Sequence, residues 1–173
     1  MSARMMPHAA QLEVKFEPFT LARLDDVMQI ERASYDCPWS RQNFTDSLYS
    51  GYAMQLLVAD GPGGEADGSV GQSPGPLLGY FVAMRGVDEV HLLNLTVAPA
   101  YRRQGWALVF LDALALWSRG VGAQWLWLEV RVSNLHAQAI YSRYGFNRVG
   151  QRKNYYPAVQ GQSEDALVMS LLL

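Results

Sequence analysis

The stretch from Leu95 to Ala107 constrains the fold of this chain more than any other, because it joins an apolar strand to a helix through a turn that suits phosphate. Leu95-Thr96-Val97 is followed by APAY and then by RRQGWA at residues 102–107. A helix start exposes backbone N–H groups without intrahelical partners, and the helix dipole adds partial positive charge. Gly105 keeps a side chain away from an approaching diphosphate, and Arg102 and Arg103 add positive charge. The stretch therefore predicts binding of a phosphorylated ligand.

Two common nucleotide sites do not fit this turn. A Walker-type loop needs a Lys followed by Ser or Thr after its last glycine, and Gly105 is followed by Trp106 and Ala107. A dinucleotide-binding turn needs three glycines at fixed spacing, which the segment lacks.

Hydrophobic periodicity outlines the elements before the turn. Strand patterns cover 12–19, 52–59, 77–85 and 89–97, and helical patterns cover 24–35 and, after the capping Ser40, 40–48. Residues 60–76 are rich in Gly, Pro and Ser and predict a flexible loop. A tolerated surface insertion is the simpler interpretation of this loop, and a substrate lid is the alternative. Nothing marks a second domain, so residues 1–173 are predicted to form one.

After the turn the patterns give a helix over 105–119 that ends at Gly120, a strand over 124–132, and a helix that Ser133 or Asn134 caps and Gly145 ends. A strand, helix, strand unit of this kind is expected to be parallel.

Glu129 interrupts the second of these strands. Trp125, Trp127, Glu129 and Arg131 share one face, and the aliphatic residues between them share the other. A buried carboxylate needs a compensating partner. Spacing alone leaves two interpretations of Glu129 open. It either forms an ion pair with Arg131 or another cation, or it is a catalytic residue.

Length and composition fit one domain in a reducing compartment. The 173 residues are 50% apolar, which allows a sizeable core, and the net charge of −2 argues against broad nucleic-acid binding. No apolar run has the length of a signal peptide or a membrane span. Cys37, the single cysteine, cannot form an internal disulfide, and it is expected to act as a small apolar residue. We therefore expect a cytoplasmic protein without stable nucleic-acid or membrane binding, and the oligomeric state stays open.

The motifs of the second half carry a family resemblance. RRQGWA, LWLEVR at 126–131, the following SN at 133–134 and IYSRYGF at 140–146 resemble the GNAT superfamily of acetyl-CoA-dependent N-acetyltransferases. CPWS at 37–40, LWLEVR, RKNYYP at 152–157 and EDA at 164–166 resemble one subfamily, the ribosomal-protein-alanine N-acetyltransferases of the RimI group. The resemblance runs from about Leu24 to the C-terminus.

This resemblance implies a fold and a set of site residues. The fold is α/β, mixed α+β, with a central mixed twisted sheet of six to seven strands flanked by about four helices. The position of Glu129 is that of the general base, and the position of Tyr141 is that of the general acid toward the departing thiolate. Acetyl-CoA is the implied cosubstrate, and no metal is expected. The expected cofactor-binding residues are Leu95, Thr96, Val97, Arg102, Arg103, Gln104, Gly105, Trp106, Ala107, Leu108 and Asn134, and the expected substrate-binding residues are Trp39, Asn154, Tyr155 and Tyr156.

Residue chemistry is consistent with these roles. Glu129 can take the amine proton directly or through water, and backbone N–H groups near Leu95 to Val97, if free of ladder pairing, can hold the thioester carbonyl. Proton transfer from a tyrosine with a pKa of ~10 to a thiolate with a pKa of ~8.5 is uphill by about 2 kcal/mol. The site must therefore shift one of these pKa values or relay the proton of Tyr141 through water.

The resemblance implies the N-terminal alanine of a small-subunit ribosomal protein as acceptor. At pH 7 an α-amine is roughly a tenth free base, whereas a lysine is free base in less than about one molecule in a thousand. A single glutamate can therefore deprotonate an α-amine more easily than a lysine side chain. A lysine side chain or a small-molecule amine is the alternative acceptor, and a non-catalytic acyl-CoA-binding module is a third hypothesis. Ala107 stands where relatives often carry glycine. Trp106 and Leu108 place apolar groups where the cofactor phosphates pass, and many relatives have Arg or Lys at the position of Leu108, which predicts weaker diphosphate binding.

Overall fold

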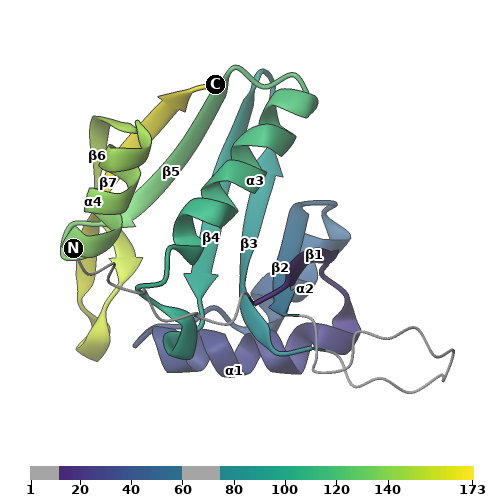
Figure 1. The fold of residues 1–173 in the computed structure, drawn as a ribbon. Helices are drawn as coiled ribbons and strands as arrows, with labels where there is room; N and C mark the ends of the chain where they lie inside the picture. Colours follow the sequence, from purple (N-terminus) through teal and green to yellow (C-terminus); the bar gives the residue numbers. More distant parts are fainter. Residues whose placement is uncertain (1–11, 60–74) are drawn as a thin grey trace, which may run out of the picture.

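The computed structural model of the protein describes residues 12–59 and 75–173. Within these ranges it has seven strands and four α-helices (Figure 1). The strands are β1 (Val14–Pro18), β2 (Ala53–Ala59), β3 (Leu77–Arg85), β4 (Glu89–Val97), β5 (Trp125–Arg131), β6 (Asn147–Pro157) and β7 (Ser163–Leu172). The helices are α1 (Leu24–Ser34), α2 (Arg41–Tyr49), α3 (Trp106–Gly120) and α4 (Leu135–Tyr144). The expected mixed sheet and four helices are confirmed. The predicted loop at 60–76 lies outside the described residues except at its last two positions.

All seven strands belong to one sheet, in the order β1-β2-β3-β4-β5-β7-β6. Neighbouring strands are antiparallel except β4 and β5, which are parallel as predicted. The β4–β5 ladder stops at the pair Leu92 and Leu128. Figure 1 shows the two strands diverging beyond this point, so the sheet opens in its middle.

Helices cover both faces of the sheet. On one face Phe110, Leu111 and Leu114 of α3 are fully buried, and residues of α4 pack beside them. On the other face Val27 of α1 and Phe44 of α2 are fully buried against β2 and β3. α1, α2 and α3 thus bury apolar side chains against the sheet, whereas α4 packs with partly buried residues.

A bulge in β4 decides which side chains face which helices. Asn94 pairs with Val82 of β3 and Leu92 pairs with Ala83, so Leu93 is an extra residue. As a result Leu92 and Leu95 both pack on the α3 side, although an even alternation would place them on opposite faces. The bulge therefore decides which face of the sheet the side chains at the end of β4 occupy.

Helix ends are set by caps. Ser40 caps α2 and Asn134 caps α4, each through its side-chain oxygen, and Gly145 ends α4 in a left-handed conformation with φ +119°. The predicted end of α3 is one residue early, and the predicted C′ glycine is two residues early. Gly120 is still helical, and the left-handed glycine is Gly122 with φ +83°.

In the described part of the chain, the longest apolar helices fall short of what a membrane crossing needs.

Candidate functional site

The turn before α3 has the form that the sequence predicts. Gly105 is the N-cap of α3 with φ +89°, and no side chain of the described residues caps this helix. A Cβ at Gly105 would have open space around it, so in the protein by itself the left-handed φ, rather than crowding, favours glycine. Arg102 Nε donates to the carbonyl of Val97 at 3.1 Å, which ties the turn to the strand. The uncapped N–H groups of α3 thus remain available to an anion.

A cavity of about 1170 Å³ opens at this turn. Its walls come from the ends of α1 and β4, the turn, the first residues of α3, and α4. All the residues predicted to bind the cofactor line it, and so does Tyr141. Pockets for drug-sized ligands usually measure about 300–1,000 Å³, so this cavity has room for a larger, extended molecule.

Two further basic side chains line the cavity from α4. His136 and Arg143 are seven residues apart, which places them on one side of the helix, and both reach the cavity wall. Sequence reasoning missed them, although their spacing of seven residues within the predicted helix was a usable signal. Together with Arg102 and Arg103 they make the cavity a site for an anion with several charges.

Backbone groups at the end of β4 face the opening of the sheet. Ala98 N–H donates to the carbonyl of Leu78 on β3 at 2.8 Å, and successive residues of a strand point their backbone groups to alternate sides. Leu95 and Val97 therefore direct theirs away from β3, toward the gap left by β5. The carbonyl of Leu95 accepts from Tyr35 at 3.4 Å. Polar backbone at this point can hold a carbonyl or an amide of a ligand.

Two tyrosines border this gap. Tyr141 comes from α4, and Tyr35, which sequence reasoning missed, follows α1 and shares a 2.8 Å hydrogen bond with Thr96 Oγ1. Burial, with a smaller contribution from Tyr35, raises the pKa of Tyr141 well above its ordinary value. Tyr141 therefore keeps its proton at neutral pH and can act as a donor.

Glu129 lies across the gap on β5 and outside the cavity lining. Its side chain is only 5% exposed. His91 Nε2 lies 2.6 Å from Oε2, and Arg152 Nε lies 3.0 Å from Oε1. The sequence leaves open an ion pair with Arg131 or with another cation: Arg131 is wrong, because it pairs with Glu164 at 3.0 Å, and Arg152 is the cation beside Glu129. Glu129 is thus a buried carboxylate with a histidine and an arginine from other strands as its partners.

Tyr155 and Tyr156 on β6 lie near Glu129, and Tyr156 also lies near Tyr141. Arg152 lies 5.4 Å from the ring of Tyr155, and Arg131 lies 4.5 Å from the ring of Tyr156. Burial raises the pKa of Tyr156 first, and the neighbouring Tyr155, Glu129 and Tyr141 raise it further. The hydroxyl of Tyr156 therefore sits within electrostatic reach of both Glu129 and Tyr141.

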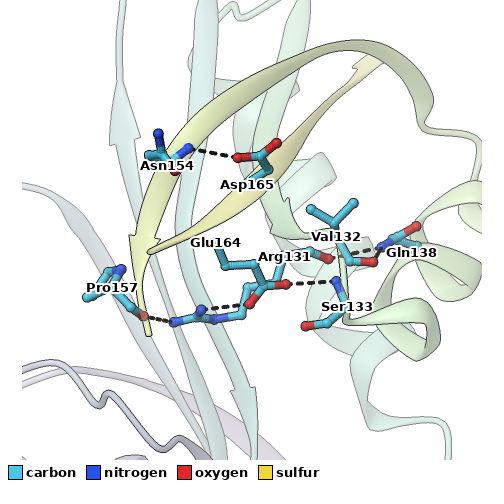
Figure 2. A network of polar contacts seen from close by, with 8 residues as sticks. All are labelled: Arg131, Val132, Ser133, Gln138, Asn154, Pro157, Glu164 and Asp165. Carbon is cyan, nitrogen blue, oxygen red and sulfur yellow. Dashed lines mark hydrogen bonds and ion pairs between the residues drawn. The ribbon is translucent and has the colours of Figure 1, made fainter. Parts of the chain in front are cut away.

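A polar clamp holds the β6–β7 hairpin against the end of β5 and the start of α4 (Figure 2). Glu164 accepts from Arg131 at 3.0 Å and from the backbone N–H of Ser133 at 2.8 Å. Arg131 also donates to the carbonyl of Pro157, and Gln138 donates to the carbonyls of Arg131 and Val132. This clamp fixes the strand that carries the tyrosines relative to the helix that carries Tyr141.

Two of the predicted substrate residues have evident structural contacts. Trp39 packs on Phe44 with ring centroids 5.3 Å apart. Asn154 has φ +51°, and its N–H donates to Asp165 while its side chain accepts from Ser163, so it shapes the hairpin. Tyr155 is exposed and Tyr156 half-buried near Glu129, which leaves both accessible to an acceptor.

The model of the acetyltransferase (GNAT) family matches residues 24–146, more than half of the chain. The chain belongs to the acetyltransferase (GNAT) family. Among similar GNAT members is the [ribosomal protein bS18]-alanine N-acetyltransferase of Haemophilus ducreyi, 35% identical over 147 residues, which are 85% of this chain and 92% of that protein. The enzyme of the same name from Escherichia coli strain K12 is 35% identical over 82% of this chain and 86% of that protein.

A solved GNAT structure agrees with the fold. The crystal structure of the ribosomal-protein-S18-alanine N-acetyltransferase from Escherichia coli matches with a TM-score of 0.75 and 30% identity, over 92% of this chain and 94% of that chain. Both sequence and fold therefore place the chain within the acetyltransferases of this family.

Proposed function

We propose that this acetyltransferase transfers the acetyl group of acetyl-CoA to the N-terminal alanine amine of ribosomal protein bS18. The observation that carries the proposal is the 35% identity, over most of both chains, to enzymes of that name. The site supplies the chemistry that this reaction needs. Because the acceptor is a ribosomal protein, we place the enzyme in the cytoplasm.

The cavity residues fit coenzyme A. The uncapped start of α3, with Arg102 and Arg103, suits a diphosphate, and His136 and Arg143 suit a further phosphate. The backbone of Leu95 and Val97 suits the amides of the pantetheine arm and the thioester carbonyl. When bound, acetyl-CoA supplies an activated acetyl group at the gap between β4 and β5.

Glu129 is the group proposed to remove the proton of the amine. It lies on the β5 side of the gap, and its carboxylate is held by partners from two other strands. An α-amine with a pKa of ~7.7–8.0 loses its proton to such a base far more readily than a lysine with a pKa of ~10.4. A single carboxylate is thus suited to an N-terminal amine.

Tyr141 is proposed to protonate the departing thiolate. Its raised pKa makes the proton harder to remove than that of an exposed tyrosine. However, the burial that disfavours the tyrosinate also disfavours a thiolate in the same cavity, because low polarity penalises either anion. Proton transfer from Tyr141 would replace a buried thiolate by a buried tyrosinate. Burial alone therefore does not widen the difference between the ordinary pKa values of the tyrosine and the thiol.

The experiment incubates the protein with acetyl-CoA and three peptides with the N-terminal sequence of bS18: one with a free alanine amine, one with a blocked N-terminus, and one with its lysines replaced by arginine. Fragment mass spectrometry maps the added acetyl group. We expect acetylation of the first and third peptides at the α-amine. Acetylation confined to lysines, or equal modification of the blocked peptide, would contradict the proposed acceptor.

A further inference from the structure

The two carboxylate oxygens of Glu129 have different surroundings. Oε2 lies 2.6 Å from Nε2 of His91, a short hydrogen bond. Oε1 is buried, and it is one of the few such polar atoms in the described part of the chain that lacks a hydrogen-bond partner. Oε2 therefore has a hydrogen-bond donor, whereas Oε1 has an ion-pair contact with Arg152 and no hydrogen bond.

His91 reaches Glu129 from the neighbouring strand at the place where the sheet opens. His91 is paired with Trp127, and the ladder ends one pair later at Leu92 and Leu128. Glu129 is two residues beyond Trp127 and points to the same face. The imidazole of His91 thus lies where the β4–β5 ladder ends, and it contacts Glu129, the first residue of β5 beyond that ladder.

An ionised carboxylate only accepts hydrogen bonds, so Nε2 of His91 must carry the proton. The His91 side chain is 21% exposed, and its backbone belongs to a paired strand, which limits its freedom. A donor in this position fixes the rotation of the carboxylate.

Arg152 stands on the other side of the carboxylate. Its Nε lies 3.0 Å from Oε1, but without the angle of a hydrogen bond, and the side chain is 53% exposed. Its guanidinium also lies near the ring of Tyr155. The half-exposed guanidinium is therefore the group between Oε1 and solvent, and an arriving cationic amine can take its place without disturbing His91.

We propose that His91 is a positioning residue for Glu129: its Nε2–H occupies Oε2 and so assigns Oε1 as the oxygen that takes the proton of the acceptor. The N–H bond of the acceptor ammonium breaks, the proton forms an O–H bond at Oε1, and the electron pair left on nitrogen becomes the nucleophile. This inference rests on the proposed function, in which Glu129 is the base.

Three variants test it with an alanine peptide and acetyl-CoA. His91→Leu removes the donor, and we expect kcat to fall about tenfold or more while KM for acetyl-CoA stays unchanged. His91→Gln keeps an N–H donor at a similar reach without an ionisable ring, and we expect kcat within about threefold of the wild-type value. Glu89→Gln changes an exposed residue of the same strand and is the control, with unchanged kcat. A full kcat in His91→Leu, or an equal loss in both His91 variants, would overturn the proposal.

A second measurement needs no acceptor and no activity. The chain has three histidines, and comparison with His91→Gln assigns the ring signals of His91 in a long-range ¹H–¹⁵N spectrum. We expect Nε2 to be protonated, and a spectrum with a bare Nε2 would overturn the proposal. If the wild-type protein fails to modify the peptide, the proposed function fails, whereas this spectrum still decides the hydrogen bond of His91. Circular dichroism shows whether His91→Leu is folded. If it is not, the kcat of His91→Gln and the ¹H–¹⁵N spectrum of the wild-type protein test the proposal.

Discussion

Oε1 of Glu31 accepts a hydrogen bond from the backbone N–H of Trp39 at 2.7 Å, which ties the loop after α1 back onto that helix. Glu31 is 1% exposed, and its other oxygen accepts from the hydroxyl of Tyr80 and from Asn94 Nδ2. Asn94 in turn accepts from Thr96, whose hydroxyl meets Tyr35 at the cavity. A buried polar chain thus connects the α1–α2 loop to the wall of the cavity at Gly105.

Removing one donor from this chain should destabilise the protein. Tyr80→Phe leaves the buried Glu31 carboxylate with one hydrogen bond fewer, and we expect the free energy of unfolding to fall by about 2 kcal/mol. Urea unfolding measures the change. Tyr49→Phe is the matched control, because Tyr49 is 76% exposed, and its effect should stay within about 0.5 kcal/mol. Equal stabilities of the two variants would mean that the Tyr80 hydroxyl contributes nothing.

Loss of the Glu129 carboxylate should abolish base catalysis but not cofactor binding. We expect Glu129→Gln to lower kcat for the alanine peptide about tenfold or more, because the amide cannot accept the proton of the amine. Glu129 lies outside the cavity lining, so the Kd for acetyl-CoA, measured by calorimetry, should stay the same. Unchanged turnover in Glu129→Gln would remove Glu129 from the mechanism.

The contribution of Tyr141 to catalysis should come from its hydroxyl proton and not from its ring. Tyr141→Phe keeps the ring that packs on Phe146 and removes the hydroxyl, so we expect a fall in kcat of about tenfold with an unchanged acetyl-CoA Kd. Since burial raises the pKa of Tyr141, its deprotonation should not reduce the rate anywhere below about pH 10. Rate profiles of wild type and Tyr141→Phe over pH 6 to ~9.5 should therefore differ in height and not in shape. A basic limb that is present in wild type and lost in the variant would contradict this.

The parts of the fold with local signals were predicted from sequence. β3 and β4 begin and end where their apolar patterns indicated, and Ser40, Asn134 and Gly145 act as the caps that their residue types predicted. β6 gave no such signal, because its residues are exposed almost throughout and show no alternation. Its strand conformation depends on pairing with β7, with two shifts of register that only the folded sheet defines.

The candidate site likewise has parts with a local sequence signal and parts that only the folded sheet defines. The turn at Gly105 is one continuous segment, so its phosphate-binding form could be predicted from the sequence, whereas Asn134 and Tyr141 lie beyond α3 and β5 and are assigned to the same site through the family resemblance. The partners of Glu129 could not, because Arg131 is close in sequence but turns to Glu164, whereas Arg152 arrives from β6. That approach depends on the strand order β5-β7-β6, in which Ala166 of β7 pairs with both Arg131 and Arg152.

Substitutions at two glycines with similar backbone conformations distinguish an effect on acetyl-CoA binding from an effect on stability. Gly105 has φ +89° and Gly122 has φ +83°, and at neither position would an added Cβ have another atom within 4 Å. An alanine at either position should cost about 1–2 kcal/mol of stability, because the left-handed region disfavours a side chain. Only Gly105 lines the cavity. We therefore expect Gly105→Ala to weaken acetyl-CoA binding in calorimetry and Gly122→Ala to leave it unchanged, and similar Kd values for the two variants would contradict a cofactor role for the turn.

The clamp on the β6–β7 hairpin should weaken in acid. Burial raises the pKa of Glu164, but hydrogen bonds from Ser133 and the nearby Arg131 outweigh it, so the pKa lies below its ordinary value. A carboxyl whose pKa is lowered in the folded protein stabilises it above the unfolded pKa of about 4.3, and this contribution is lost as the pH falls through the folded pKa.

Glu164→Gln should therefore lower the stability by about 1 kcal/mol at pH 7, since it replaces charge-assisted hydrogen bonds at a partly exposed site by neutral ones. The difference from wild type should shrink as the pH falls below about 4, because the wild-type carboxyl then becomes neutral as well. Thermal unfolding of both proteins over this range measures it, with Glu89→Gln as a control for removal of an exposed carboxylate outside the clamp. A difference that stays constant down to acid pH would show that the charge of Glu164 does not hold the hairpin, and that its shape alone does.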